Sequence, residues 1–157
     1  MTEDHRLAAI MFTDIVGYTS LMGSDEDKAF EVLRKNRKIH TKFIEQFNGT
    51  LIKEMGDGML AQFNSAADSV RCAIEIQQQA STELDGKVRI GIHLGDITIE
   101  NNDVFGDGVN IASRLQSIAE PGGIFISDSV HSAIRSKKDI ESQYRGEVKL
   151  KNVNYAV

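Results

Sequence analysis

The feature that most constrains the fold is a run of six apolar residues, Leu7 to Phe12, that ends just before a carboxylate and a glycine. Such a near-continuous apolar run predicts a buried strand. The sequence continues as TDIVGYTS, which places Asp14 at the exposed end of the strand and Gly17 in the following turn. A glycine turn lets backbone N–H groups approach an anion closely. A carboxylate beside such a turn indicates a site for a cation and a phosphate group.

The length of 157 residues predicts one domain, spanning residues 1–157. The net charge of −5 gives no global field that would attract nucleic acid or an anionic membrane, so neither is expected as a partner. The single cysteine, Cys72, excludes an internal disulfide and favours a reducing compartment, so we expect a cytoplasmic domain. No apolar run approaches 18 residues, and therefore no membrane segment is expected in this chain.

Hairpin signals occur among alternating strand and helix patterns, which favours an α+β fold over a fully parallel sheet. Residues 50–63 predict a hairpin, because two apolar runs flank Gly56-Asp57-Gly58, a strong turn signal. Residues 88–99 alternate as in a long half-buried strand. Further elements are expected as helices over 24–48, from 64 onward, over 106–117 and from 127 onward, and as strands at 124–126 and within 142–157.

Cys72 and His93 each have a structural and a functional interpretation. Cys72 is interpreted as a packed core residue rather than a nucleophile, because no cationic neighbour activates it. His93 lies on the more open face of the strand at 88–99, and a structural or interface role is favoured over a catalytic one. In the helix at 106–117, Ile111, Leu115 and Ile118 predict the core stripe, while Asn110 and Arg114 share a different face.

Asp14 and Asp57 both stand at strand-end turns. Two carboxylates and a backbone oxygen are ligands that Mg²⁺ prefers, together with substrate phosphates. Two such ions can clamp the attacking and leaving oxygens of a phosphoryl or nucleotidyl transfer. Strand-end aspartates also serve as plain turn formers, and the residues alone leave that alternative open.

Three motifs give the chain a resemblance to the catalytic domain of the class III nucleotidyl cyclases, specifically the adenylate cyclases. They are FTDIVGYT at 12–19, KEMGDG at 53–58 and DVFGDGVNIASR at 103–114, and the similarity extends from about Arg6 to the end. The resemblance implies a ferredoxin-like βαββαβ core with additional helices and strands. It also implies adenylate cyclase activity, which converts ATP to 3′,5′-cyclic AMP and pyrophosphate.

The resemblance also assigns site residues in this sequence. Asp14 and Asp57 match the metal-binding aspartates, with the Ile15 carbonyl as a further ligand, for two Mg²⁺ (or Mn²⁺) per active site. The remaining matches are the phosphate-binding turn of Gly17, Tyr18 and Thr19, the adenine-recognising pair Lys53 and Asp103, the transition-state pair Asn110 and Arg114, and the triphosphate-binding Lys151. Guanylate cyclases carry other residues at positions 53 and 103, such as Glu and Cys, so Lys53 with Asp103 indicates ATP.

In the family, the two halves of one site come from different subunits, so the resemblance implies a head-to-tail homodimer with two equivalent sites. The end of the chain at Val157, inside a strand-like pattern, suggests an excised domain, with a short natural protein as the open alternative. The resemblance implies that a sensory or regulatory domain could be fused to it, although nothing in this chain identifies one. Two alternatives remain open: a guanylate or relaxed-specificity cyclase, and a catalytically silent module that binds nucleotide or dimerises. The group that accepts the ribose proton also remains open.

Overall fold

An antiparallel sheet with the strand order β2-β3-β1-β4-β5 forms the centre of the protein, and the short β6 pairs in parallel with β4. The computed structural model describes residues 4–85, 87–143 and 146. The elements are β1 (Asp4–Ile15), α1 (Tyr18–Ser24), α2 (Glu26–Gln46), β2 (Thr50–Met55), β3 (Gly58–Phe63), α3 (Ala66–Glu83), β4 (Val88–Glu100), β5 (Asp103–Phe105), α4 (Asp107–Ile118), β6 (Ile124–Ile126) and α5 (Asp128–Ile134).

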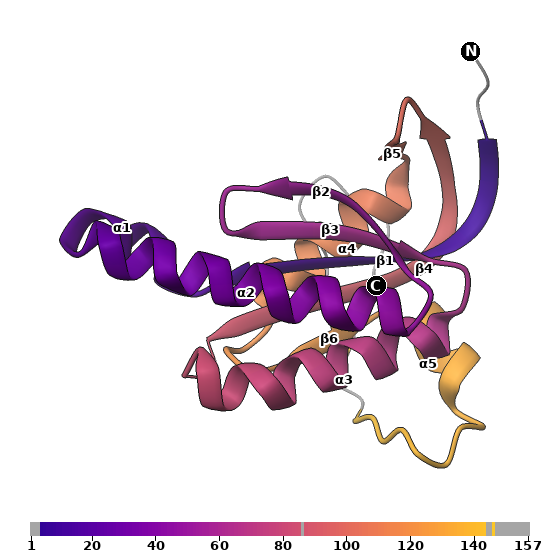
Figure 1. Ribbon diagram of the computed structural model, residues 1–157. Coiled ribbons are helices and arrows are strands. Elements are labelled where there is room, and N and C mark those ends of the chain that lie inside the picture. The colour runs from indigo at the N-terminus through magenta and orange to yellow at the C-terminus, as the bar shows by residue number, and fades with distance from the viewer. Residues whose placement is uncertain (1–3, 86, 144–145, 147–157) are drawn as a thin grey trace.

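Six of these elements, β1-α2-β2-β3-α3-β4, form the ferredoxin-like βαββαβ core. The four core strands lie in the order β2-β3-β1-β4, and β1 pairs antiparallel with both β3 and β4. This arrangement places both crossover helices, α2 and α3, on the same face of the sheet, as Figure 1 shows. The predicted α+β fold is therefore confirmed, and α1, α4, α5, β5 and β6 are its additional elements.

The main core lies between the sheet and the helices α2 and α3. It contains Met11, Ile39, Phe63, Ile76 and Ile92, each at most 2% exposed, together with many small residues. Cys72 is fully buried in this core, and burial raises the pKa of its thiol to about 12. The prediction that Cys72 is a packed residue is confirmed.

Helix α4 covers part of the opposite face of the sheet, behind β1 and β4 in Figure 1. Gly91 of β4 permits this contact, because a Cβ there would lie 2.2 Å from the Gln116 nitrogen and 2.6 Å from the Ala112 oxygen. The backbone of α4 thus rests directly on the backbone of β4. The prediction of an open second face of this strand is wrong at Gly91, which is buried beneath α4.

Several local predictions need correction. Residues 18–24 form the helix α1, where the sequence predicted only a turn, and Asp103–Phe105 form an unpredicted strand. In α4 the core stripe includes Ile111, Leu115 and the small Ala112, whereas Ile118 is 43% exposed. The predicted C-terminal strand pair lies outside the described residues except at 142, 143 and 146. Within the described ranges, no helix combines the length and apolar character needed to cross a membrane.

A buried histidine in α2 makes the stability of this fold depend on pH. His40 is fully buried, and desolvation lowers its pKa from 6.5 to about 4. Below pH 6.5 the unfolded chain binds a proton that the folded chain excludes, so stability is complete above pH 6.5 and falls as the pH approaches 4. Between pH 7 and pH 5 we expect His40 to account for a loss of about 2 kcal/mol in the free energy of unfolding.

Urea unfolding at pH 7 and pH 5 measures this loss, with His40→Gln as the comparison. The variant lacks the titrating ring, so its free energy of unfolding should fall by about 2 kcal/mol less than that of the unmodified chain over the same interval. Equal losses in the two proteins would show that other groups cause the acid sensitivity.

Candidate active site

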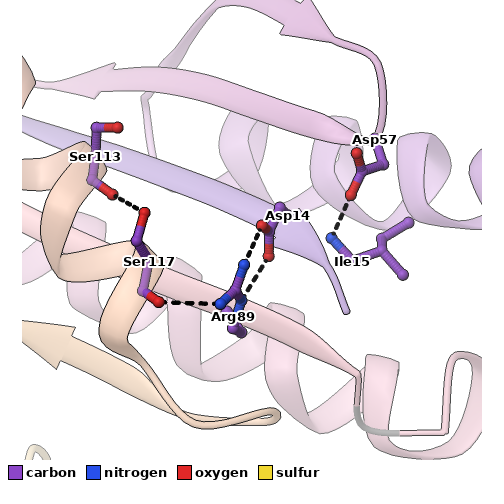
Figure 2. Close-up of polar contacts among 6 residues, drawn as sticks. All are labelled: Asp14, Ile15, Asp57, Arg89, Ser113 and Ser117. Carbon is purple, nitrogen blue, oxygen red and sulfur yellow. Dashed lines mark hydrogen bonds and ion pairs between the residues drawn. The ribbon is translucent and has the colours of Figure 1, made fainter. Parts of the chain in front are cut away.

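The two predicted metal-binding carboxylates lie at the same end of the sheet. Asp14 is the penultimate residue of β1, and Asp57 lies in the turn between β2 and β3. Pairing of β1 with β3 brings this turn beside the end of β1, where Asp57 Oδ2 accepts a hydrogen bond of 2.9 Å from the Ile15 N–H (Figure 2). Both carboxylates therefore adjoin the backbone of Ile15.

This donor set fits a hard cation. Both side chains offer carboxylate oxygens, which Mg²⁺ and Mn²⁺ accept, and neither thiolate nor imidazole is among them. Across the described residues, no cluster of three or more His, Cys, Asp or Glu side chains forms a complete cage for a metal. An ion held by two carboxylates suits Mg²⁺, which takes its remaining ligands from water and substrate phosphates.

Arg89, which the sequence analysis did not single out, is a direct partner of Asp14. Its Nε and Nη2 donate to the two Asp14 oxygens at 2.9 and 2.5 Å, and its Nη1 donates to the Ser117 carbonyl at 3.0 Å (Figure 2). The hydrogen bond to Asp14 raises the pKa of Arg89. Arg89 therefore balances the charge of Asp14 and connects it to the last turn of α4.

The register of the sheet explains this contact. Arg89 lies directly opposite Asp14 in the antiparallel pair of β1 and β4. Opposite charges on facing residues of neighbouring strands attract one another, and a bidentate arginine–carboxylate pair is strongly oriented. The sequence places Arg89 on the same strand face as His93. This position alone did not reveal the contact with Asp14, because the contact depends on the pairing of β1 with β4.

The predicted phosphate-binding turn begins at Gly17, whose φ of +80° is a conformation that favours glycine. Gly17 is the N-cap residue of α1, so Tyr18 and Thr19 are the first residues of a short helix rather than parts of an extended turn. The first N–H groups of a helix have no partner within it. The backbone of Gly17, Tyr18 and Thr19 thus retains donors beside Asp14 and Ile15.

Lys53 and Asp103 meet although β2 and β5 lie at opposite ends of the strand order. The Lys53 ammonium lies 3.1 Å from Asp103 Oδ2, and Asp103 Oδ1 accepts a hydrogen bond of 2.8 Å from the Val104 N–H. The Val104 hydrogen bond, with a smaller contribution from Lys53, lowers the pKa of Asp103. A cationic donor and an ionised acceptor from opposite ends of the strand order are thus in direct contact.

Asn110 and Arg114 lie on a face of α4 that is turned away from its core stripe. Asn110 is exposed and Arg114 is half-buried, while Ile111 and Leu115 are buried against the sheet. Within the described part of the chain, neither Asn110 nor Arg114 forms a side-chain hydrogen bond or ion pair, and each is therefore available to a ligand. Lys151, the last predicted site residue, lies outside the described residues.

The His93 side chain takes part in a hydrogen-bond network with Ser127 and Ser129. Its Nδ1 lies 2.6 Å from the Ser127 hydroxyl, and burial lowers its pKa to about 4. The hydroxyls of Ser127 and Ser129 are 3.0 Å apart, and Ser129 donates to the Leu94 carbonyl at 2.7 Å. This network joins β4 to the start of α5, in agreement with the structural role predicted for His93.

Comparisons with known proteins agree with the motifs. A family model described as "Adenylate and Guanylate cyclase catalytic domain" matches residues 1–156. The chain is 38% identical over 160 residues to "Putative adenylate cyclase 3" of Rhizobium meliloti, with 97% of this chain covered. The chain spans 27% of that relative's length.

Two solved structures share the fold. An "Adenylate/Guanylate Cyclase/Hydrolase" from Silicibacter pomeroyi has 38% identity and a TM-score of 0.89, with 99% of this chain and 95% of that chain covered. The adenylyl cyclase CyaB of P. aeruginosa has a TM-score of 0.90 at 22% identity, covering 99% of this chain and 93% of that chain, which is evidence for the fold alone.

Proposed function

Because this chain belongs to the adenylate and guanylate cyclase catalytic domain family, we propose that it converts ATP into 3′,5′-cyclic AMP and pyrophosphate. The observation that most directly supports the proposal is that Asp14 and Asp57 both adjoin Ile15, beside the Gly17 turn. The ribose 3′-hydroxyl attacks the α-phosphorus of the same nucleotide, and the bond from this phosphorus to the pyrophosphate breaks. Positioning and charge stabilisation then supply the catalysis, without a side-chain nucleophile.

Asp14, Asp57 and the Ile15 carbonyl would hold two Mg²⁺ or Mn²⁺ ions. When bound, these ions supply Lewis acidity to the ribose hydroxyl and to the phosphates. Asp57 is held in place by the Ile15 N–H, and Asp14 by Arg89. The backbone of Gly17, Tyr18 and Thr19 binds the terminal phosphates, and Lys151 is the proposed lysine for the triphosphate.

Lys53 and Asp103 select adenine over guanine. Lys53 donates to a ring nitrogen of adenine, and Asp103 accepts from the exocyclic amine. Guanine carries a carbonyl at the position of that amine, which would face the Asp103 carboxylate without a hydrogen between them, and mismatches of this kind discriminate strongly. The Lys53–Asp103 pair is itself partly exposed, so a base can replace this mutual contact at low cost.

Asn110 orients the ribose, and Arg114 neutralises the charge that develops at the α-phosphate. A positioned cation at developing charge is among the larger contributions that a side chain makes to catalysis. The lack of a partner for Arg114 within the described part of the chain is consistent with a group that binds only the nucleotide.

The proposed active form is a head-to-tail homodimer, in which one chain supplies Asp14 and Asp57 and the other supplies the residues for the base and the transition state. Leu7 and Phe105 support an interface, because both are large apolar residues more than half exposed and both line one cavity of about 500 Å³. A partner chain that covers them would bury this surface.

The proposed reaction predicts a specific product from a competition between two substrates. The protein is incubated with equal ATP and GTP and with Mg²⁺ or Mn²⁺, and the products are identified by mass spectrometry. Cyclic AMP and pyrophosphate should form only with metal, and cyclic AMP should exceed cyclic GMP by at least about 100-fold because of Lys53 and Asp103.

Two other outcomes would change the proposal. Cyclic GMP as the main product would overturn the base assignment and favour a guanylate cyclase. If no cyclic nucleotide formed even at high protein concentration, where dimers assemble, the catalytic proposal would give way to a silent nucleotide-binding module.

A further inference from the structure

A polar cluster lies directly beneath the proposed metal site, inside the apolar core. Thr13 of β1 is 2% exposed, and Asn36 and His40 of α2 are fully buried. The Thr13 hydroxyl lies 2.8 Å from His40 Nε2, and His40 Nδ1 lies 2.9 Å from the Asn36 carbonyl oxygen. Buried polar groups cost stability unless they are paired, and in this cluster the Thr13 hydroxyl and both ring nitrogens of His40 have partners.

The directions of the two hydrogen bonds follow from the Asn36 carbonyl. A carbonyl only accepts, so His40 Nδ1 carries the hydrogen and donates to Asn36. Burial keeps the imidazole neutral at pH 7, and Nε2 is then an acceptor. The Thr13 hydroxyl therefore donates to His40, and a directed chain of two hydrogen bonds runs from β1 to the backbone of α2.

The backbone of Thr13 adjoins the segments that carry both carboxylates. It precedes Asp14 in β1, and because side chains alternate along a strand, Thr13 faces α2 while Asp14 faces Arg89. On the neighbouring strand, Thr13 pairs with Met59, and a Cβ at Gly58 would lie 3.1 Å from the Thr13 carbonyl oxygen. The turn that carries Asp57 is therefore packed closely against the backbone of Thr13.

We propose that Thr13 and His40 are positioning residues of the carboxylate site: their hydrogen bond fixes the end of β1 against α2 and so sets the separation of Asp14 from Asp57. The inference rests on the proposed function insofar as these carboxylates bind a divalent cation. A small shift of Thr13 moves Asp14 directly and moves Asp57 through Gly58. Residues that orient metal ligands in this way affect affinity strongly, although they never touch the ion.

The test measures binding of Mn²⁺ alone, by electron paramagnetic resonance titration of the full chain without nucleotide. Thr13→Val keeps the shape of the side chain and removes the hydroxyl, and we expect its Mn²⁺ affinity to fall by about tenfold or more. Thr13→Ser restores the hydroxyl and should bind within about twofold of the unmodified chain. Ser69→Ala removes another buried hydroxyl, which donates to Ala66 within α3, and should leave Mn²⁺ affinity unchanged.

Circular dichroism at the titration temperature establishes that each variant is folded. His40→Leu removes the other partner of the hydrogen bond and should weaken Mn²⁺ binding in the same way, so the proposal stays testable if Thr13→Val does not fold. With saturating metal, Thr13→Val should recover most of its kcat, because the defect lies in metal affinity. A purely structural role would instead lower the unfolding midpoint without moving the Mn²⁺ affinity.

Unchanged Mn²⁺ affinity in folded Thr13→Val overturns the inference. The absence of a Mn²⁺ site that depends on Asp57 in the unmodified chain overturns it as well. Failure of the proposed function gives a different result: the chain would bind Mn²⁺ through Asp14 and Asp57, respond to Thr13→Val, and still form no cyclic nucleotide.

Discussion

Replacing Asp57 with asparagine is expected to reduce cyclic AMP formation by at least about 1,000-fold, because it removes one of the two proposed charged metal ligands. The substitution should leave the fold intact, since the amide oxygen of asparagine can still accept the hydrogen bond from the Ile15 N–H. Cyclic AMP is measured by mass spectrometry at saturating ATP and Mg²⁺, and circular dichroism checks that the variant is folded.

Asp27→Asn is the matched control. Asp27 is an exposed carboxylate in the first turn of α2, and within the described residues its side chain forms no hydrogen bond or ion pair with the β2–β3 turn or the end of β1. Its loss should change activity by less than about twofold. An Asp57→Asn variant that keeps more than about one tenth of the activity would show that this carboxylate is not a required metal ligand.

Mixing two inactive variants is expected to restore activity. Asp57→Asn would damage the proposed metal-binding half of a site, and Arg114→Ala would damage the proposed transition-state half. If each site takes one half from each chain, a mixed dimer carries one site with both defects and one intact site. Random assembly makes half of the dimers mixed, so the mixture should recover about a quarter of the unmodified activity.

The measurement follows cyclic AMP after the two variants are mixed at equal concentrations and given time to exchange subunits. Each variant alone at the same total concentration is the control, and each should remain nearly inactive. No recovery, with subunit exchange verified by labelled chains, would indicate that every site is built within one chain and would overturn the shared-site proposal.

Much of the core could be predicted because its signals are local. Gly56-Asp57-Gly58 between two apolar runs identified the β2–β3 hairpin. Ser65, a residue type that commonly caps helices, caps α3 by accepting a hydrogen bond from the Asp68 N–H. The helix α1 lacked such signals. It begins at a glycine without a side-chain cap, contains Thr, Ser and Gly, and buries none of its residues.

The β4–β5 hairpin was missed although a signal was present. Asn101 and Asn102 have φ values of 53° and 62°, the conformation of a two-residue hairpin turn that asparagine tolerates. The exposure of Ile118 could not be predicted from its spacing, because the contact between α4 and Gly91 determines which side of the helix faces the sheet.

For the site, the motifs predicted Asp14, Asp57, Lys53 and Asp103. The structure places Asp14 and Asp57 beside Ile15, and Lys53 in contact with Asp103. Arg89 required knowledge of strand register, because it lies far from Asp14 in the sequence and meets it only when β1 and β4 pair. The hydrogen bond from Thr13 to His40 likewise depends on how α2 packs across the sheet.

The contacts of Arg89 have a consequence for the proposed dimer as a whole. Arg89 binds Asp14, which would serve one catalytic centre of the proposed dimer, and also the Ser117 carbonyl at the end of α4, the helix that would serve the other centre. A ligand that draws Asp14 away from Arg89 at one centre would therefore change the contact between Arg89 and the end of α4 at the second centre. If the proposed dimer forms, this linkage would be reciprocal, so that occupancy of either centre would change the ligand affinity of the other centre by the same factor.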